Sequence, residues 1–275
     1  MRVFAVRGRL GVRLAGEERG EGVPIVLLHG LTATRRYVVM GSRVLERSGH
    51  RVVAYDARGH GHSSPAPAAS EYTYELLAGD LHAVLDELGI ERAALAGASM
   101  GAQTALRFTL DHPERVLALG LITPAFDPEA PVGPDAYAGW DALAHGLREG
   151  GVEGFVEASD LDAVPPRFRD TVETVSRQRL SAHDHPLAVA DALEAVPRSR
   201  PFAAWEDLAR VEAPTVVVAS RDEADPSHPL ATAERYAAAI DDATLVLEEP
   251  DRSPIAWQGG QLSKVLVDLI ERASA

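Results

Sequence analysis

Ser99 is the residue of this sequence with the clearest capacity for chemistry. It lies at the centre of the pentapeptide G-A-S-M-G at 97–101, directly after an apolar strand pattern at 93–96 and before a helical pattern at 102–110. A serine on such a sharp strand-to-helix turn is raised above the sheet as a nucleophile, and the turn admits only small neighbouring residues. We therefore predict that Ser99 is a nucleophile. The alternative is a glycine-rich turn with an incidental serine.

The elements that would position Ser99 follow from hydrophobic patterning. Short apolar runs alternate with helical patterns, which is typical of βαβ units and a mostly parallel sheet with helices on both faces. The clearest helix is expected at 72–88, with Ser70 as its N-cap. Strands are expected at 2–6 and 10–14 as an antiparallel pair, and at 23–28, 51–55, 93–96, 117–122, 215–219 and 243–247; later helices are expected at 231–240 and 262–272.

The alternation of strands and helices stops between Pro124 and about Trp205. This segment opens with closely spaced prolines and continues as helical patterns without strands. We interpret it as a helical insertion at 125–205 that divides an α/β core into a first part at 1–124 and a second part at 206–275. The alternative is that the middle of the chain is further core.

Composition and charge narrow the classes of function. The 275 residues include 27 Lys and Arg against 41 Asp and Glu, a formal net charge of -14, which disfavours nucleic acid and anionic membranes as partners. The absence of cysteine excludes disulfides and thiolate chemistry. No apolar stretch has the length of a signal peptide or a membrane span, so a cytoplasmic protein with a small-molecule substrate or ligand is expected.

Four motifs together resemble those of the α/β-hydrolase family, and the resemblance covers nearly the whole chain. Besides the serine motif, they are L-L-H-G at 27–30, D-A-R-G-H-G-H-S at 56–63, and the strand pattern that follows A-P at 213–214. The resemblance implies the α/β-hydrolase fold, with 125–205 as a lid. Nothing in the sequence demands a metal or organic cofactor, so none is expected. The resemblance also implies that the backbone N–H groups of Leu31 and Met100 form an oxyanion hole, and that His29 and Gly30 lie at the substrate.

The sequence departs from this family at the catalytic base. The family places a histidine after the last strand, but the corresponding segment, 251–254, has Arg252 at that position. A guanidinium stays protonated and has no acceptor, so Arg252 cannot take a proton from Ser99. The acid could be Asp222, Glu223 or Asp225. One hypothesis is that Arg252 pairs with Asp222 or Glu223 in the space of the usual acid–histidine pair.

Other histidines are weak candidates for the base from sequence alone. His228, next to the acid segment, is interpreted as a solvated loop residue, and His29 as a residue that shapes its loop. His183 and His185 fall in the predicted lid. They resemble a pair of metal ligands, but no third ligand is evident, so they are interpreted as residues of a surface loop.

The function that the sequence favours is a serine hydrolase with an atypical base, acting on a small ester, lactone or related carbonyl substrate. The alternative is a non-hydrolytic member of the family. It would be a ligand-binding pseudoenzyme that uses Ser99 and Arg252 to hold an anionic ligand, or a lyase, isomerase or cyclase that relies on oxyanion stabilisation. The sequence does not constrain the oligomeric state.

Overall fold

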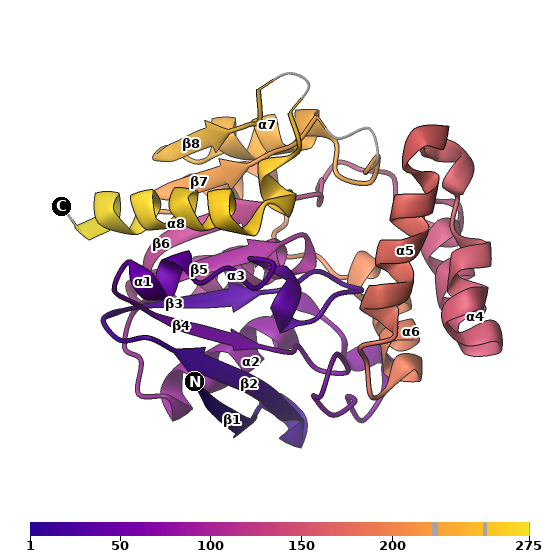
Figure 1. Ribbon diagram of the computed structural model, residues 1–275, viewed down its shortest axis with the longest axis horizontal. Coiled ribbons are helices and arrows are strands. Elements are labelled where there is room, and N and C mark those ends of the chain that lie inside the picture. The colour runs from indigo at the N-terminus through magenta and orange to yellow at the C-terminus, as the bar shows by residue number, and fades with distance from the viewer. Residues whose placement is uncertain (222–224, 250–251, 275) are drawn as a thin grey trace.

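The central feature of the fold is one mostly parallel sheet with helices on both faces (Figure 1). The computed structural model describes residues 1–221, 225–249 and 252–274. Within these residues, eight strands are ordered β1-β2-β4-β3-β5-β6-β7-β8, which confirms the predicted α/β fold. The strands are β1 (Arg2–Arg7), β2 (Arg13–Arg19), β3 (Val23–Leu28), β4 (His50–Tyr55), β5 (Ala93–Ala98), β6 (Val116–Ile122), β7 (Thr215–Val218) and β8 (Ala243–Val246).

The first two strands are antiparallel, and the sheet becomes parallel from β4 onward. The strand predicted at 10–14 begins later, at Arg13. Leu10 is part of a short 3-10 turn and has a φ of 58°, in the left-handed region, so it cannot continue an extended strand. The expected strand included this turn because its apolar residues have a strand-like pattern.

Two hydrophobic cores cover the two faces of the sheet. One face packs on α2 (Tyr74–Glu87), α3 (Met100–Asp111) and α7 (Leu230–Ala239), and the other on α1 (Val44–Arg47) and α8 (Gly259–Ser274). Neighbouring residues of one strand, such as Leu27 and Leu28, enter opposite cores, which is why the parallel strands are apolar throughout. The N-cap of α2 is Thr73 rather than Ser70, since the Thr73 hydroxyl accepts a hydrogen bond from Leu76 N–H at 3.3 Å.

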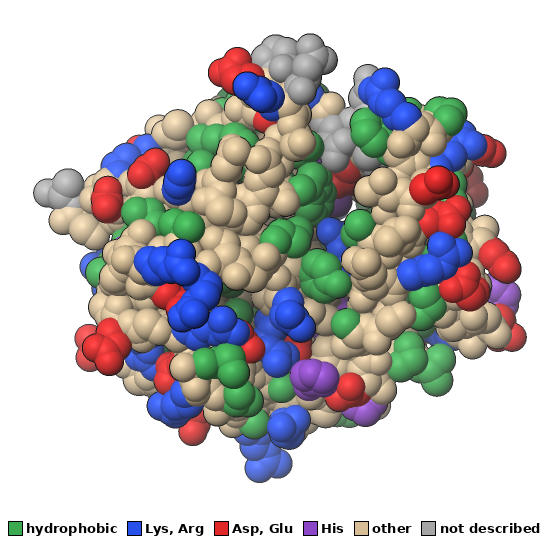
Figure 2. Space-filling view, viewed as in Figure 1, with side chains coloured by type: hydrophobic (Ala, Val, Ile, Leu, Met, Phe, Trp, Pro, Cys, Tyr) green, Lys and Arg blue, Asp and Glu red, His purple; other side chains and the backbone are tan. Residues whose placement is uncertain are grey.

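The chain between β6 and β7 contains helices and no strand. Its helices are α4 (Pro134–Ala158), α5 (Arg169–Leu180) and α6 (Pro186–Ala195), which lie together beside one end of the sheet (Figure 1). Their inner residues share a hydrophobic cluster with Leu31 and Met100. Charged side chains of both signs cover the outer side of α4 and α5 (Figure 2). The segment therefore packs over the end of the sheet at which Ser99 lies.

None of the helices in the described ranges is long and apolar enough to cross a membrane.

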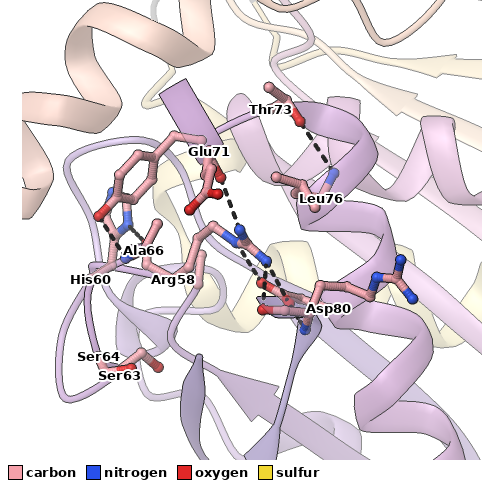
Figure 3. Close-up of polar contacts among 12 residues, drawn as sticks. Arg58, His60, Ser63, Ser64, Ala66, Glu71, Thr73, Leu76 and Asp80 are labelled. Atoms are coloured by element: carbon pink, nitrogen blue, oxygen red, sulfur yellow. Dashed lines mark hydrogen bonds and ion pairs between the residues drawn. The ribbon is translucent and has the colours of Figure 1, made fainter. Parts of the chain in front are cut away.

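A buried ion pair fixes the loop that follows β4 (Figure 3). Arg58 and Asp80 are 0% and 1% exposed, and Arg58 Nε and Nη2 donate to the two carboxylate oxygens at 2.8 and 2.9 Å. Arg58 Nη1 also donates to Glu71 O at 2.8 Å. Burial raises the pKa of Asp80, and the guanidinium opposes that rise. The pair thus ties the predicted D-A-R-G loop to α2.

Candidate active site

Ser99 occupies the strained turn that its sequence motif predicts. Its φ of 50° and ψ of -111° lie outside the ordinary regions, between the end of β5 and the start of α3. A Cβ on Gly97 would collide with the backbone of Gly101, and a Cβ on Gly101 would collide with Leu28 O. The neighbouring positions therefore require glycine because backbone approaches them directly.

His228, and not the residue at 252, lies at hydrogen-bonding distance from Ser99. The Ser99 hydroxyl lies 2.8 Å from His228 Nε2, and His228 Nδ1 lies 2.8 Å from Asp225 Oδ1. With Nδ1–H donating to the carboxylate, Nε2 is left as an acceptor for the Ser99 hydroxyl proton. The three side chains form the chain of contacts that nucleophilic catalysis by serine requires.

A β-turn places Asp225 and His228 side by side. His228 N–H donates to Asp225 O at 3.2 Å, which closes a four-residue turn with Pro226 at its second position, where proline is favoured. The turn lies in the segment between β7 and α7. Asp225 and His228 are thus neighbours in sequence, although both are far along the chain from Ser99.

The carboxyl group of Asp225 is held ionised. Burial raises its pKa, but hydrogen bonds from His228 and Ser227 and the nearby charge of Arg179 outweigh burial, so the pKa lies below its ordinary value. The Ser227 hydroxyl donates to Asp225 Oδ1 at 2.7 Å. The side chains of His228 and Asp225 are only 16% and 20% exposed, so His228 is not the solvated loop residue that the sequence suggested.

Arg252 lies apart from this cluster. Its side chain is exposed, its backbone N–H donates to Glu249 O at 3.1 Å, and it is absent from the described lining of the cavity at Ser99. The segments after β7 and β8 are joined instead by Arg221, whose Nη1 donates to Glu248 O at 2.7 Å. The contacts of the described residues give no support to the catalytic role predicted for Arg252. Asp222 and Glu223, the other predicted partners, lie outside the described residues.

The two predicted oxyanion-hole residues lie at the nucleophile, whereas His29 serves its own loop. Leu31 and Met100 both line the cavity that contains Ser99, and Met100 begins α3, where the first N–H groups have no partner within the helix. His29 Nε2 accepts from Ala57 N–H at 2.9 Å and its Nδ1 donates to Gly30 O at 2.8 Å. Both ring nitrogens of His29 are thus occupied, which corrects its predicted contact with substrate. Gly30 belongs to the same loop and lies beside Ser99, since a Cβ added to it would be 3.6 Å from Ser99 Cβ.

His183 is buried rather than on the surface of the helical segment. Its Nδ1 accepts from Gly61 N–H at 2.8 Å, and its Nε2 donates to Thr32 O at 3.1 Å. Its ring packs edge-on against His60, which in turn lies beside His29. Burial is the largest cause that lowers the pKa of all three, to about 3 for His29 and about 4 for His183. These neutral histidines join the chain after α5 to the loops after β3 and β4.

The described part of the chain holds no group of three or more His, Cys, Asp or Glu side chains suited to a metal ion.

A cavity of about 330 Å³ opens at Ser99 between the sheet and the helical segment. Its wall combines residues of the sheet side with residues of α4 and of the chain after α6. Aromatic and apolar side chains predominate, which suits a small, largely apolar substrate. The lining residues include Tyr74, Gln103, Phe126, Asp127, Tyr137, Trp140, Arg198 and Arg200.

Comparisons with known proteins agree with the fold. The family model described as "alpha/beta hydrolase fold" matches residues 23–251. The chain is 32% identical over 228 residues to 2-hydroxy-6-oxononadienedioate/2-hydroxy-6-oxononatrienedioate hydrolase 2 of Pseudomonas putida, covering 78% of this chain and 77% of the relative. The enol-lactonase from Burkholderia xenovorans LB400 superposes with a TM-score of 0.76 at 25% identity, covering 98% and 100% of the two chains. A thermophilic esterase from Thermogutta terrifontis gives a TM-score of 0.79 at 24% identity over the full length of both chains. The chain belongs to the α/β-hydrolase family.

Proposed function

We propose that the protein is a serine hydrolase of small ester, lactone or related carbonyl substrates. In this proposal Ser99 is the nucleophile, His228 the general base and Asp225 the acid that orients it. The observation that carries the proposal is the pair of 2.8 Å contacts that His228 makes, through Nε2 to Ser99 and through Nδ1 to Asp225. The base and the acid thus come from the same turn, between β7 and α7.

The reaction would follow two acyl-transfer steps. Ser99 Oγ attacks the substrate carbonyl carbon while His228 Nε2 takes the hydroxyl proton, and Asp225 stabilises the resulting imidazolium. Collapse of the tetrahedral intermediate releases the alcohol, which takes the proton from His228. A water molecule then attacks the acyl-enzyme, gives its proton to His228 and releases the carboxylic acid, with the proton returning to Ser99.

The surroundings of Ser99 support this assignment. We infer that the N–H groups of Leu31 and Met100 stabilise the oxyanion, since both residues line the cavity and Met100 is at a helix N-terminus. We also infer that the segment at 125–205 serves as a lid that excludes water. Relatives named as an esterase and an enol-lactonase are consistent with a carbonyl substrate.

The non-hydrolytic alternative depended on a missing base. Because His228 lies at hydrogen-bonding distance from Ser99, a pseudoenzyme is not needed to explain Arg252. The contact between His228 and Ser99 does not favour a lyase or an isomerase over a hydrolase.

The decisive experiment is labelling of the purified protein with a fluorophosphonate, detected by intact mass. Labelling reports an activated serine, because the reagent requires the serine to lose its proton. We expect stoichiometric labelling of the natural protein, none with Ser99→Ala, and strongly slowed labelling with His228→Gln. Arg252→Gln is the matched control and should label at the natural rate.

Two results would count against the proposal. Labelling that survives Ser99→Ala would place the reactive group elsewhere. Equal labelling rates for His228→Gln and the natural protein would remove His228 from the mechanism. A short-chain p-nitrophenyl ester assayed in parallel reports turnover with the same four proteins.

A further inference from the structure

We propose that Arg179 is a positioning residue for the acid–base turn: it docks α5 onto the core through two aromatic rings and places a positive charge of the helical segment beside Asp225. This role rests on the proposed function, because Asp225 and His228 are the acid and the base only there. It makes the docked helical segment a part of what sets the charge at the acid, in addition to any role in covering the cavity.

Two arginines of α5 serve different parts of the molecule. Arg177 and Arg179 are two residues apart, so they project from nearly opposite faces of the helix. Arg177 Nη2 lies 2.9 Å from Glu153 Oε2 and its Nη1 lies 2.8 Å from Glu173 Oε2, so both of its partners belong to the helical segment. Within the described ranges, no carboxylate lies at ion-pair distance from Arg179, and its buried Nε has no hydrogen-bond partner.

Arg179 instead contacts two aromatic rings of the core. Its guanidinium carbon lies over the Tyr37 ring at 5.5 Å and over the Trp257 ring at 5.4 Å from the ring centres. Tyr37 belongs to the segment after β3 and Trp257 to the segment after β8, and these segments pack on each other, since a Cβ on Gly259 would collide with Val39 O. A planar, weakly hydrated guanidinium is suited to aromatic faces. The contact therefore joins α5 to the core without neutralising the charge.

The charge of Arg179 acts on the proposed acid. Burial lowers the pKa of Arg179, and attraction to the Asp225 carboxylate and to the Tyr37 phenol opposes that change. Burial raises the pKa of Asp225, hydrogen bonds from His228 and Ser227 lower it, and the Arg179 charge lowers it further. A guanidinium stays protonated at every working pH. The charge is therefore present whenever α5 is docked.

This charge has a defined consequence for the reaction. The acid–base pair can take the Ser99 proton only when Asp225 is ionised and His228 is neutral. A positive charge beside the pair disfavours the binding of a further proton, so it extends the active range towards lower pH. Loss of the charge should move the acid limb of the rate profile to higher pH. A residue that only held the helical segment in place would lower the rate at every pH without moving the midpoint.

The test is the rate of fluorophosphonate labelling of Ser99 between pH 5 and pH 9. We expect Arg179→Gln to raise the midpoint of the acid limb by about half a pH unit to one pH unit. Arg179→Lys should keep most of the natural midpoint, because an ammonium also carries the charge over aromatic rings. Arg179→Met should show the same shift as Arg179→Gln, and its apolar chain suits the aromatic neighbours if the glutamine variant does not fold.

The matched control is Arg177→Gln. It removes the same charge from the same helix, but its ionic partners lie in the helical segment, so the midpoint should stay unchanged. A second comparison tests the aromatic contact: Tyr37→Phe keeps the ring and should leave the midpoint in place, whereas Tyr37→Leu should show part of the shift. Melting temperatures measured over the same pH range restrict the comparison to folded protein.

The outcomes separate this inference from the proposed function. An unchanged midpoint in Arg179→Gln and Arg179→Met, even with a lower rate at every pH, would overturn the role of Arg179 and leave the serine mechanism in place. An equal shift in Arg177→Gln would also overturn it, because the effect would then come from net charge. No labelling of the natural protein at any pH would overturn the proposed function itself.

Discussion

The turn at Ser99 and the turn at His228 supply the two halves of the proposed reaction, and they are built in opposite ways. Ser99 lies between β5 and α3, and the backbones of Leu28 and Gly101 pack directly against its neighbouring glycines. His228 lies in the segment before α7, where side-chain hydrogen bonds to Ser99 and Asp225 hold its ring. The nucleophile is therefore fixed by the packing of the core, whereas the base is fixed by polar contacts at its edge. Substitutions of the glycines at the first turn should affect folding, and substitution of His228 at the second should affect activity alone.

The largest expected effect concerns His228, at the second of the two turns. His228→Gln should lower kcat/KM for a short-chain ester by about 10⁴-fold, because no group then accepts the Ser99 proton. The melting temperature should change little, since the substitution leaves no buried cavity. Steady-state kinetics and calorimetry measure the two quantities. A loss of stability in parallel with activity would mean that the turn is part of the folded core.

The opposite pattern is expected at Gly101. Gly101→Ala places a Cβ against Leu28 O and should lower the free energy of unfolding by about 2–3 kcal/mol, as overpacking of a core does. Denaturant titration measures this loss. Gly260→Ala is the matched control, since nothing lies within 4 Å of the Cβ that it would add. Equal stability of the two variants would contradict the account of the nucleophile turn.

An intermediate effect is expected from the buried histidines beside the nucleophile. Their pKa values are lowered from 6.5, to about 3 for His29 and about 4 for His183, and that of His60 is lowered as well. The unfolded chain binds more protons, so stability should fall as pH decreases below 6.5, by about 1.4 kcal/mol per pH unit for each histidine. His183→Gln keeps one donor and one acceptor and should make the dependence shallower. Denaturant titrations between pH 7 and pH 5 would show it, and an unchanged slope would contradict the burial of His183.

The smallest expected effect concerns Arg252. If the family's usual base position were still competent, Arg252→His would increase ester hydrolysis by orders of magnitude. Because His228 already contacts Ser99 and Arg252 is exposed, we expect a change of no more than about twofold, as for other surface substitutions. A large gain in kcat/KM would show that two positions compete for the role of base.

The sequence predicted the parts of this molecule that depend on neighbouring residues. The turn at Ser99 is specified within five residues, and the parallel strands are apolar runs bounded by turns, so both could be located from the sequence. The error at Leu10 was also local, because an apolar pattern does not reveal a residue with a φ of 58°. The overall fold was predictable for the same reason: it repeats one local unit.

The residues that were misjudged depend on distant partners. His183 contacts Gly61 and Thr32, which are 122 and 151 residues away, and His228 contacts Ser99 across 129 residues. No local pattern encodes such pairs. A signal for the base that we propose did exist in the sequence, namely an acid and a histidine three residues apart around a proline. The expected position of the base after the last strand outweighed that signal.

Both members of the acid–base pair directly precede a proline, since Asp225 is followed by Pro226 and His228 by Pro229. A residue before proline is sterically restricted to extended conformations, and the proline fixes its own φ. The turn consequently has few conformations to lose when it orders, so its entropy cost is small. If Asp225 and His228 act as we propose, the chain restricts them towards their working positions before any substrate arrives, which is preorganisation achieved by local backbone stiffness.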